Sequence, residues 1–252
     1  MIQLRDLSDD RLVTGCLYCQ GLEESREHVP STVFLDRPFP TQLPVVAACV
    51  DCNNDFSSDE AYVASVIEAT VVGSADPDDF ARERIANLVR KRPSLSAKLK
   101  AAKVVDENQT QFRIEPDRFR RIIRKLAQGH AAFELSQVRR DEPKSLWWYP
   151  IGLMTPEELD EFDRSHVVEM LGELGSRGFQ RLFVTQLSTK SFDIEESTQN
   201  LLRNDWIEVQ EGRYRYLAID DLEEVRIKIV LSEYLACEVV WSKIDYDSDF
   251  RI

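Results

Sequence analysis

The sequence lacks long hydrophobic runs. No segment approaches the ~18 consecutive apolar residues of a membrane-spanning helix. Residues 1–10 are charged and have no apolar core, unlike the start of a secretory signal. These two absences predict a cytoplasmic protein that has no membrane partner, in a compartment where structural disulfides are rare.

The chain also lacks the positive net charge that is typical of nucleic-acid-binding proteins. It contains 32 Lys and Arg against 45 Asp and Glu, which gives a formal net charge of −13. The charges are unevenly distributed, because residues 82–125 contain 14 Lys/Arg and 5 Asp/Glu, whereas residues 141–252 contain 12 and 24. This asymmetry predicts a nucleic-acid-binding face in the basic segment. Solvated surface charge would produce the same pattern and remains the alternative.

We expect basic side chains of residues 82–125 to contact the phosphates of a nucleic acid, most simply DNA, without reading its sequence. The predicted contact residues are Arg82, Arg84, Arg90, Lys91, Arg92, Arg120, Arg121, Arg124 and Lys125. The acidic half of the chain could limit non-specific DNA binding, or dock on a basic partner such as a regulatory protein.

Cysteine is scarce, but four of the five cysteines form two closely spaced pairs. Cys16 and Cys19 form the first pair, and Cys49 and Cys52 form the second. A CxxC spacing directs two thiolates toward one ion, and two such pairs complete the tetrahedral sulfur shell that zinc prefers. Two disulfides or a redox motif are the alternatives, and the predicted compartment favours zinc. Cys237 lies in an apolar run and is expected to be buried.

The sequence has only three histidines. His28 follows Glu27 between the cysteine pairs, and because histidine titrates near neutral pH it is a candidate general base. His130 and Glu134 have the i, i+4 spacing of two ligands on one helix face, but no third ligand accompanies them. His166 is expected to be an ordinary surface or core residue.

The pattern of the chain predicts an α+β fold in three segments. The first is an N-terminal zinc module, the second is basic and helical, and the third is an acidic small antiparallel sheet with helices. Their expected boundaries are residues 1–75, 76–140 and 141–252. No internal repeat or low-complexity linker interrupts them.

Capping residues and hydrophobic periodicity place the elements. Helices are expected at about residues 51–72, 77–91, 95–103 and 116–133, and another begins at the capping box Thr155–Glu158. Strands are expected at residues 181–187, at 206–209 paired with 214–218, and at 226–240, as one strand or two. The pair Trp147–Trp148 is interpreted as core packing rather than as a base-stacking platform.

The motif order Cys16-x-x-Cys19, Arg26-Glu27-His28-Val29-Pro30 and Cys49-x-x-Cys52-Asn53 resembles the zinc-containing branch of the HNH endonuclease family. The resemblance covers about residues 14–60. In that family a treble-clef zinc site supports a ββα-metal active site. The resemblance therefore implies hydrolysis of DNA phosphodiester bonds, with a structural zinc ion and a catalytic Mg²⁺ or Mn²⁺ ion.

Three residues take catalytic roles if the resemblance holds. It implies that His28 is the general base, that Glu27 and Asn53 hold the divalent ion, and that zinc positions His28 to face Asn53. Alternation along a strand directs Glu27 and His28 to opposite faces unless the strand ends or bends there. The zinc ion would be structural, because four thiolates leave no open coordination position.

Two positions depart from the family pattern. Gln42 is the nearest candidate for the middle asparagine that steadies the loop between strand and helix. Phe56 stands where the helix usually has a lysine. Glu60 is expected to be a solvated helix carboxylate rather than a metal contact.

The leading hypothesis is a metal-dependent HNH-like endonuclease. The alternatives are a non-catalytic zinc module that binds nucleic acid or a partner protein, and a nuclease subunit that is silent until a partner activates it. The trio of His28, Glu27 and Asn53 favours the enzyme, because a pure binding module has no need for it.

Overall fold

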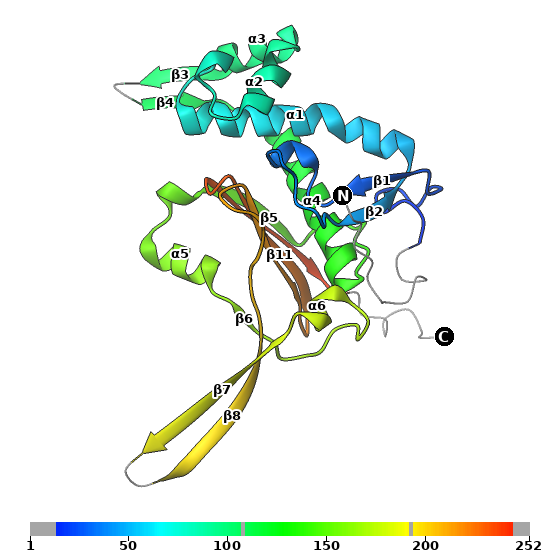
Figure 1. Ribbon diagram of the computed structural model, residues 1–252, viewed down its shortest axis with the longest axis vertical. Helices are drawn as coiled ribbons and strands as arrows, with labels where there is room; N and C mark the ends of the chain where they lie inside the picture. The colour runs from blue at the N-terminus through cyan, green and yellow to red at the C-terminus, as the bar shows by residue number, and fades with distance from the viewer. Residues whose placement is uncertain (1–13, 107–108, 192–193, 244–252) are drawn as a thin grey trace.

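The computed structural model describes residues 14–106, 109–191 and 194–243. It is a mixed α and β structure (Figure 1). The predicted absence of a secretory signal at residues 1–10 lies outside the described residues. Within them, no helix has both the length and the apolar character needed to cross a membrane.

The N-terminal part is a two-stranded hairpin followed by a long helix. Strand β1 (Ser25–His28) pairs antiparallel with β2 (Val45–Ala48), and a 3-10 turn, η2 (Thr32–Phe34), lies between them. Helix α1 (Val50–Val72) follows. Cys49 caps its N-terminus, because the Cys49 side chain accepts a hydrogen bond from the Cys52 N–H. The helix ends at Gly73, where the left-handed φ of 70° favours glycine. The helix predicted for this region is confirmed.

The middle part is helical, as predicted, but it contains an additional hairpin. Its elements in order are η3 (Pro77–Asp79), α2 (Glu83–Arg90), α3 (Pro93–Ala102), β3 (Lys103–Asp106), β4 (Gln109–Phe112) and α4 (Pro116–Leu135). The single helix expected from residue 77 is divided into a 3-10 turn and α2. Pro93 occupies the first turn of α3, where its missing N–H costs no helical hydrogen bond.

The C-terminal part contains a five-stranded antiparallel sheet. Its strand order is β5 (Ser145–Pro150), β12 (Leu235–Ser242), β11 (Glu224–Leu231), β10 (Tyr214–Asp220) and β9 (Ile207–Gln210). The predicted hairpin at residues 206–218 is therefore confirmed as β9 and β10. The predicted strand region at residues 226–240 is confirmed as the β11–β12 pair.

A second, three-stranded sheet follows α5 in the chain. The connecting elements are η4 (Ile151–Leu153), α5 (Pro156–Asp163), with the predicted capping box at Thr155, and α6 (Arg177–Gln180). The sheet order is β6 (His166–Val167), β8 (Ile194–Asn204) and β7 (Phe183–Ser191). The β7–β8 hairpin extends away from the rest of the molecule (Figure 1).

Helix α4 lies at the centre of the core. Its buried residues Phe119, Ile122 and Ile123 belong to one hydrophobic cluster that also includes Tyr62 of α1 and Ile229 of β11. Helix α4 contacts α1 and also β10, β11 and β12 of the five-stranded sheet. The cluster therefore contains side chains from all three of the predicted segments, because the apolar stripe of α4 is wide enough to pack on two sides.

Candidate functional site

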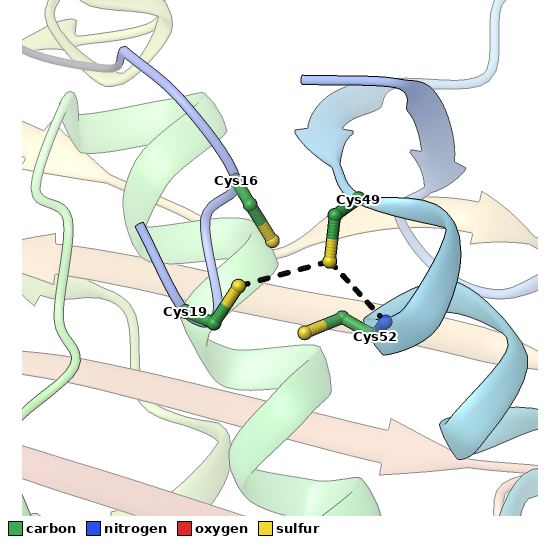
Figure 2. A group of neighbouring side chains, drawn as sticks. All are labelled: Cys16, Cys19, Cys49 and Cys52. Carbon is green, nitrogen blue, oxygen red and sulfur yellow. Dashed lines mark hydrogen bonds between the residues drawn. The ribbon is translucent and has the colours of Figure 1, made fainter. Parts of the chain in front are cut away.

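The two cysteine pairs lie on different local structures. Cys16 and Cys19 are on a tight turn, in which the Cys16 N–H donates to the Gly21 carbonyl (2.8 Å) and the Gln20 N–H donates to the Cys16 carbonyl (3.0 Å). The left-handed φ of Gly15, 71°, starts this turn. Cys49 and Cys52 lie at the beginning of α1, where the Cys52 N–H donates to the Cys49 sulfur (3.3 Å; Figure 2).

The four cysteine side chains converge on one point (Figure 2). Their Sγ atoms all lie within 4.8 Å of one another, and those of Cys19 and Cys49 are 3.7 Å apart. Zn–S bonds of ~2.3 Å in a tetrahedron place sulfur atoms ~3.8 Å apart. The cluster therefore fits a metal ion such as zinc, as the spacing of the cysteines predicts. The four cysteines are free, so the alternative of two disulfides is not what this structure contains.

The thiols of the cluster differ in their readiness to ionise. Burial raises the pKa of Cys16, but backbone hydrogen bonds from Cys49, Cys19 and Tyr18 outweigh it and lower this pKa to about 7. Burial, together with hydrogen bonds to Cys49 and Cys19, raises the pKa of Cys52 well above its ordinary value. A cation at the centre of the cluster would favour all four thiolates, because its charge offsets their mutual repulsion.

Hydrogen bonds join the first cysteine pair to the hairpin and to α1. The Leu17 N–H donates to the Ala47 carbonyl (3.0 Å), and the Glu24 N–H donates to the Ala48 carbonyl (3.1 Å). The amide nitrogen of Asn53 donates to the Ser25 hydroxyl (3.3 Å), which connects α1 to β1. The cysteine cluster, the hairpin and the beginning of α1 therefore form one hydrogen-bonded unit.

His28 lies at the end of β1, opposite Val45 of β2. Its side chain is half-buried, and it has no hydrogen-bond or ion-pair partner among the residues that the structure describes. Glu27 is buried on the other face of the strand, as strand alternation predicts. Asn53 contacts Ser25, which alternation places on the Glu27 face, so the expected arrangement in which His28 faces Asn53 is not what the described contacts show.

Glu27 belongs to a buried cluster of charged groups, which we call the lysine cluster: Glu27, Ser31, Glu60 and Lys125. The Lys125 ammonium donates to Glu27 at 2.7 Å, to the Ser31 hydroxyl at 2.8 Å and to Glu60. The Ser31 hydroxyl lies 3.1 Å from the Glu27 carboxylate and 2.5 Å from that of Glu60. The exposed fractions of these residues are between 2% and 9%.

The lysine cluster corrects two expectations. Glu60 is not a solvated carboxylate but is 9% exposed and paired with Lys125. Lys125 is 2% exposed, so it is not available for phosphate contacts. Both carboxylates compensate the desolvated ammonium, which would be costly to bury alone.

The arrangement at Glu27 does not fit a divalent cation. The carboxylate already binds the Lys125 ammonium at 2.7 Å. A Mg²⁺ or Mn²⁺ ion on the same carboxylate would lie beside a buried positive charge, and the two cations would repel each other. Asn53, the other predicted ligand, donates to Ser25 instead.

Phe56 connects the cysteine turn to α4. Its ring packs edge-on against Tyr18 at 4.9 Å, and the side chains of Arg121 and Lys125 lie over it at 4.9 and 5.1 Å. An aromatic residue therefore stands at the position where the family helix usually has a lysine. Gln42, the predicted loop-steadying residue, is exposed and makes no side-chain hydrogen bond within the described part of the chain.

Most of the predicted phosphate-binding residues have partners inside the molecule. Arg82 is 3% exposed and donates to Asp36 and to two backbone carbonyls, so it also is unavailable to a nucleic acid. Side-chain or backbone acceptors also bind Arg84, Arg90, Arg121 and Arg124. Three residues are exposed and lack such partners among the described residues: Lys91, Arg92 and Arg120.

Trp148 and His130 pack in the core. Trp148 stacks on Phe119 in the core at 6.0 Å, which supports the core interpretation. His130 is fully buried, stacks on Tyr216 at 3.7 Å and hydrogen-bonds to the Tyr214 hydroxyl at 2.7 Å. Burial, and then the charge of Arg181, lower the pKa of His130 to about 3, so it is neutral near pH 7.

His166 lines a cavity beside Asp221. Its Nε2 atom lies 2.8 Å from the Asp221 carboxylate, in a cavity of about 640 Å³. No further group of His, Cys, Asp or Glu in the described ranges converges as a metal site besides the four cysteines.

Comparisons of the chain with protein-family models, with curated proteins and with solved structures found no match. The argument for a function therefore rests on the residues and contacts described above.

Proposed function

We propose that this chain is an HNH-type endonuclease that hydrolyses DNA phosphodiester bonds, with His28 as the general base. The supporting observation is the position of His28: a half-buried imidazole without a described partner, at the end of a strand whose hairpin is bonded to a four-cysteine cluster. The half-exposed ring nitrogens of His28 are open to water and substrate, whereas those of His130 are enclosed in the core, with a hydrogen bond to Tyr214.

The proposed reaction is an attack of water on phosphorus, assisted by His28. His28 accepts a proton from water, the water oxygen forms a bond to phosphorus, and the bond from phosphorus to the leaving sugar oxygen breaks. A zinc ion in the cysteine cluster would hold the turn at Cys16 against the beginning of α1, in the manner of a treble clef, and so fix the position of β1. The role of this ion is structural.

The divalent ion implied by the resemblance stays a separate proposal. Glu27 and Asn53 would hold Mg²⁺ or Mn²⁺ only after Glu27 exchanged its Lys125 partner for the metal. We therefore assign no catalytic step to that ion. The Lys125 ammonium already places one positive charge beside the hairpin, at 2.7 Å from Glu27.

Nicking of supercoiled plasmid tests this proposal. The purified, zinc-loaded chain should convert the plasmid to the nicked form, and His28→Ala should abolish the conversion while its zinc content and circular dichroism stay unchanged. Assays with Mg²⁺, with Mn²⁺ and with EDTA decide whether a second metal takes part. Full activity in His28→Ala would overturn the assignment of the base.

The second candidate is a zinc module without catalytic activity, which binds nucleic acid or a partner protein. One observation favours the absence of catalysis: the Lys125 ammonium occupies the Glu27 carboxylate that a catalytic divalent ion would need. Six of the predicted phosphate-binding residues have partners within the molecule, which favours a partner protein over a nucleic acid as the ligand. Plasmid binding without nicking, by wild type and His28→Ala alike, would support it. Nicking that appears only when a further protein is added would instead support a partner-activated nuclease subunit.

A further inference from the structure

The five-stranded sheet has one face on the core and the other partly covered by α5. Trp148 of β5 stacks on Phe119 of α4, whereas its neighbour Trp147 packs edge-on against Phe162 of α5 at 5.6 Å. Successive residues of a strand point to opposite faces, so α4 and α5 lie on opposite sides of β5. On the α5 side, sheet and helix enclose a cavity of about 700 Å³.

Aromatic and apolar side chains form much of the cavity lining. They are Trp147, Tyr149, Met154 and Phe162. The indole N–H of Trp147 donates to the Glu238 carboxylate at 3.1 Å, which fixes the orientation of its ring. Tyr149 lies two residues further along the same strand face and is 46% exposed. The cavity therefore presents one fixed aromatic ring and one accessible aromatic ring.

The positive groups in the cavity already have hydrogen-bond acceptors within the molecule. Lys228 donates to the backbone carbonyls of Phe162 (2.9 Å) and Glu161 (3.4 Å) at the end of α5. Arg226 binds Glu238 at 2.8 Å and also Glu224. Neither cation is available for an anionic ligand without breaking these bonds.

The negative groups on α5 are less fully neutralised. Glu157, Glu158 and Glu161 line the cavity and are exposed. Glu157 has no hydrogen-bond or ion-pair partner among the described residues. Glu158 instead accepts the Thr155 N–H at 2.8 Å, and Glu161 pairs with Arg164 at 2.8 Å. An aromatic lining beside the free carboxylate of Glu157 favours a cation, because the ring faces and the carboxylate attract the same charge.

A second cavity, of about 640 Å³, adjoins the first and shares Glu161, Arg226 and Lys228 with it. It contributes the additional carboxylates of Glu169, Asp221, Glu223 and Glu224. The two cavities together extend along α5 and are predominantly acidic, as is the whole of residues 141–252, with 24 Asp/Glu against 12 Lys/Arg. This extent suits an extended basic segment better than a single free amine.

We propose that the cavity under α5 binds a lysine or arginine side chain from a basic segment of a partner protein. The cationic end group lies between Tyr149 and Glu157, and its aliphatic stem packs on Trp147 and Met154. The adjoining cavity accommodates neighbouring residues of the same segment. This binding site is independent of the cysteine cluster and of His28.

Fluorescence anisotropy with the full chain tests this inference. The probe is a fluorescein-labelled peptide of four Lys–Gly repeats, and its fully lysine-acetylated form is the control for charge. We expect saturable binding of the first peptide and none of the second. Glu157→Gln and Tyr149→Leu should each weaken binding by roughly three- to tenfold, the range of a lost cation–π or ionic contact.

Glu211→Gln is the matched control, because it removes an equal charge from an exposed turn outside the cavity. If Glu211→Gln weakens binding as much as Glu157→Gln does, the peptide binds only through the net negative charge of the chain, and the inference is overturned. Equal binding of the acetylated peptide, or no binding of either, would also overturn it. Sedimentation of the chain alone completes the test: a dimer that Glu157→Gln dissociates would assign the cavity to a second copy instead.

Discussion

At the scale of the residue, Lys125 is the side chain whose environment differs most from expectation. It lies on the basic side of an amphipathic helix by sequence, yet it is buried between two carboxylates that come from β1 and α1. Its partners are 98 and 65 residues away in the chain. Hydrophobic periodicity identifies the faces of a helix, but it does not predict contacts between residues so far apart in the chain. The sequence therefore predicted α4 but not the lysine cluster.

Replacing Lys125 tests whether the lysine cluster stabilises the fold. Lys125→Met keeps a long apolar side chain but leaves Glu27 and Glu60 buried without their cation. We expect the free energy of unfolding to fall by about 3–5 kcal/mol, the usual cost of breaking a buried ion pair by removing one partner. Urea denaturation measures this change.

Arg120→Met is the matched control on the same helix. Arg120 is exposed and has no ion-pair partner among the described residues. Its replacement should change stability by no more than about 0.5 kcal/mol. Equal decreases in the free energy of unfolding of the two variants would show that the ion pairs of Lys125 with Glu27 and Glu60 do not stabilise the fold.

His130 gives a prediction for pH. Its pKa is about 3 in the folded chain because burial, and then Arg181, disfavour the charged form, whereas the unfolded value is near 6.5. The unfolded state therefore binds the extra proton between these values, and stability falls as the pH falls below about 6.5. From pH 7 to pH 5 this one group should cost about 2 kcal/mol.

The comparison with His130→Gln isolates that contribution. Glutamine does not titrate and can still bond to the Tyr214 hydroxyl. The unfolding free energy of the variant should therefore decline less between pH 7 and pH 5 than that of the wild type, by about 2 kcal/mol. Parallel declines would mean that His130 is protonated, or exposed, in the folded chain.

At the scale of the element, capping residues and hydrophobic periodicity were sufficient to predict the long helices α1 and α4. Helix α1 ends at the predicted glycine, and α4 begins at the predicted proline. The β3–β4 hairpin was missed, because its strands have only four residues each and the burial along β3 does not alternate. Pro93 lies between the helices expected at about residues 77–91 and 95–103, and it begins the second of them, α3, since proline suits the first turn of a helix as well as the residue after one.

The beginning of α1 depends on the cysteine cluster. Cys49 caps the helix and belongs to the group of four sulfurs that can hold zinc. Cys49→Ser should therefore lose the bound zinc and destabilise the turn at Cys16 together with the hairpin, because metal binding contributes directly to folding at such sites. Zinc analysis by mass spectrometry and thermal unfolding by circular dichroism measure the two effects.

Cys237→Ser is the control for Cys49→Ser. Cys237 is fully buried in β12, where burial raises the pKa of its thiol, and it lies outside the group of four cysteines. This variant should retain one zinc ion per chain even if its melting temperature falls. Retention of zinc in Cys49→Ser would contradict the assignment of the cluster as the metal site.

At the scale of the whole molecule, helix α4 packs the three segments that the sequence predicted into one hydrophobic core. Helix α4 packs on α1 and on the five-stranded sheet, and the same hydrophobic cluster contains residues of each. The cysteine cluster could be predicted in full, because its ligands occur as two local pairs. The placement of Glu27 in the interior could not, because it depends on tertiary contacts with α1 and α4.

The arrangement separates two roles that the sequence had combined. Glu27 stabilises the interface between the hairpin and α4, whereas His28 lies on the opposite strand face and has no described partner. The residue that compensates the buried lysine and the residue proposed to do chemistry are therefore adjacent in the chain, but their side chains lie on opposite faces of β1. This separation predicts that variants of His28 leave stability unchanged, unlike variants of Lys125.

The rate of plasmid nicking by His28→Ala, measured against wild type and against His166→Ala at equal zinc content, tests the central proposal most directly. If His28 is the general base, its replacement should slow nicking by about 10²-fold or more, and His166→Ala should nick at the wild-type rate. Equal rates for all three proteins, or no nicking by a folded and zinc-loaded wild type, would contradict it.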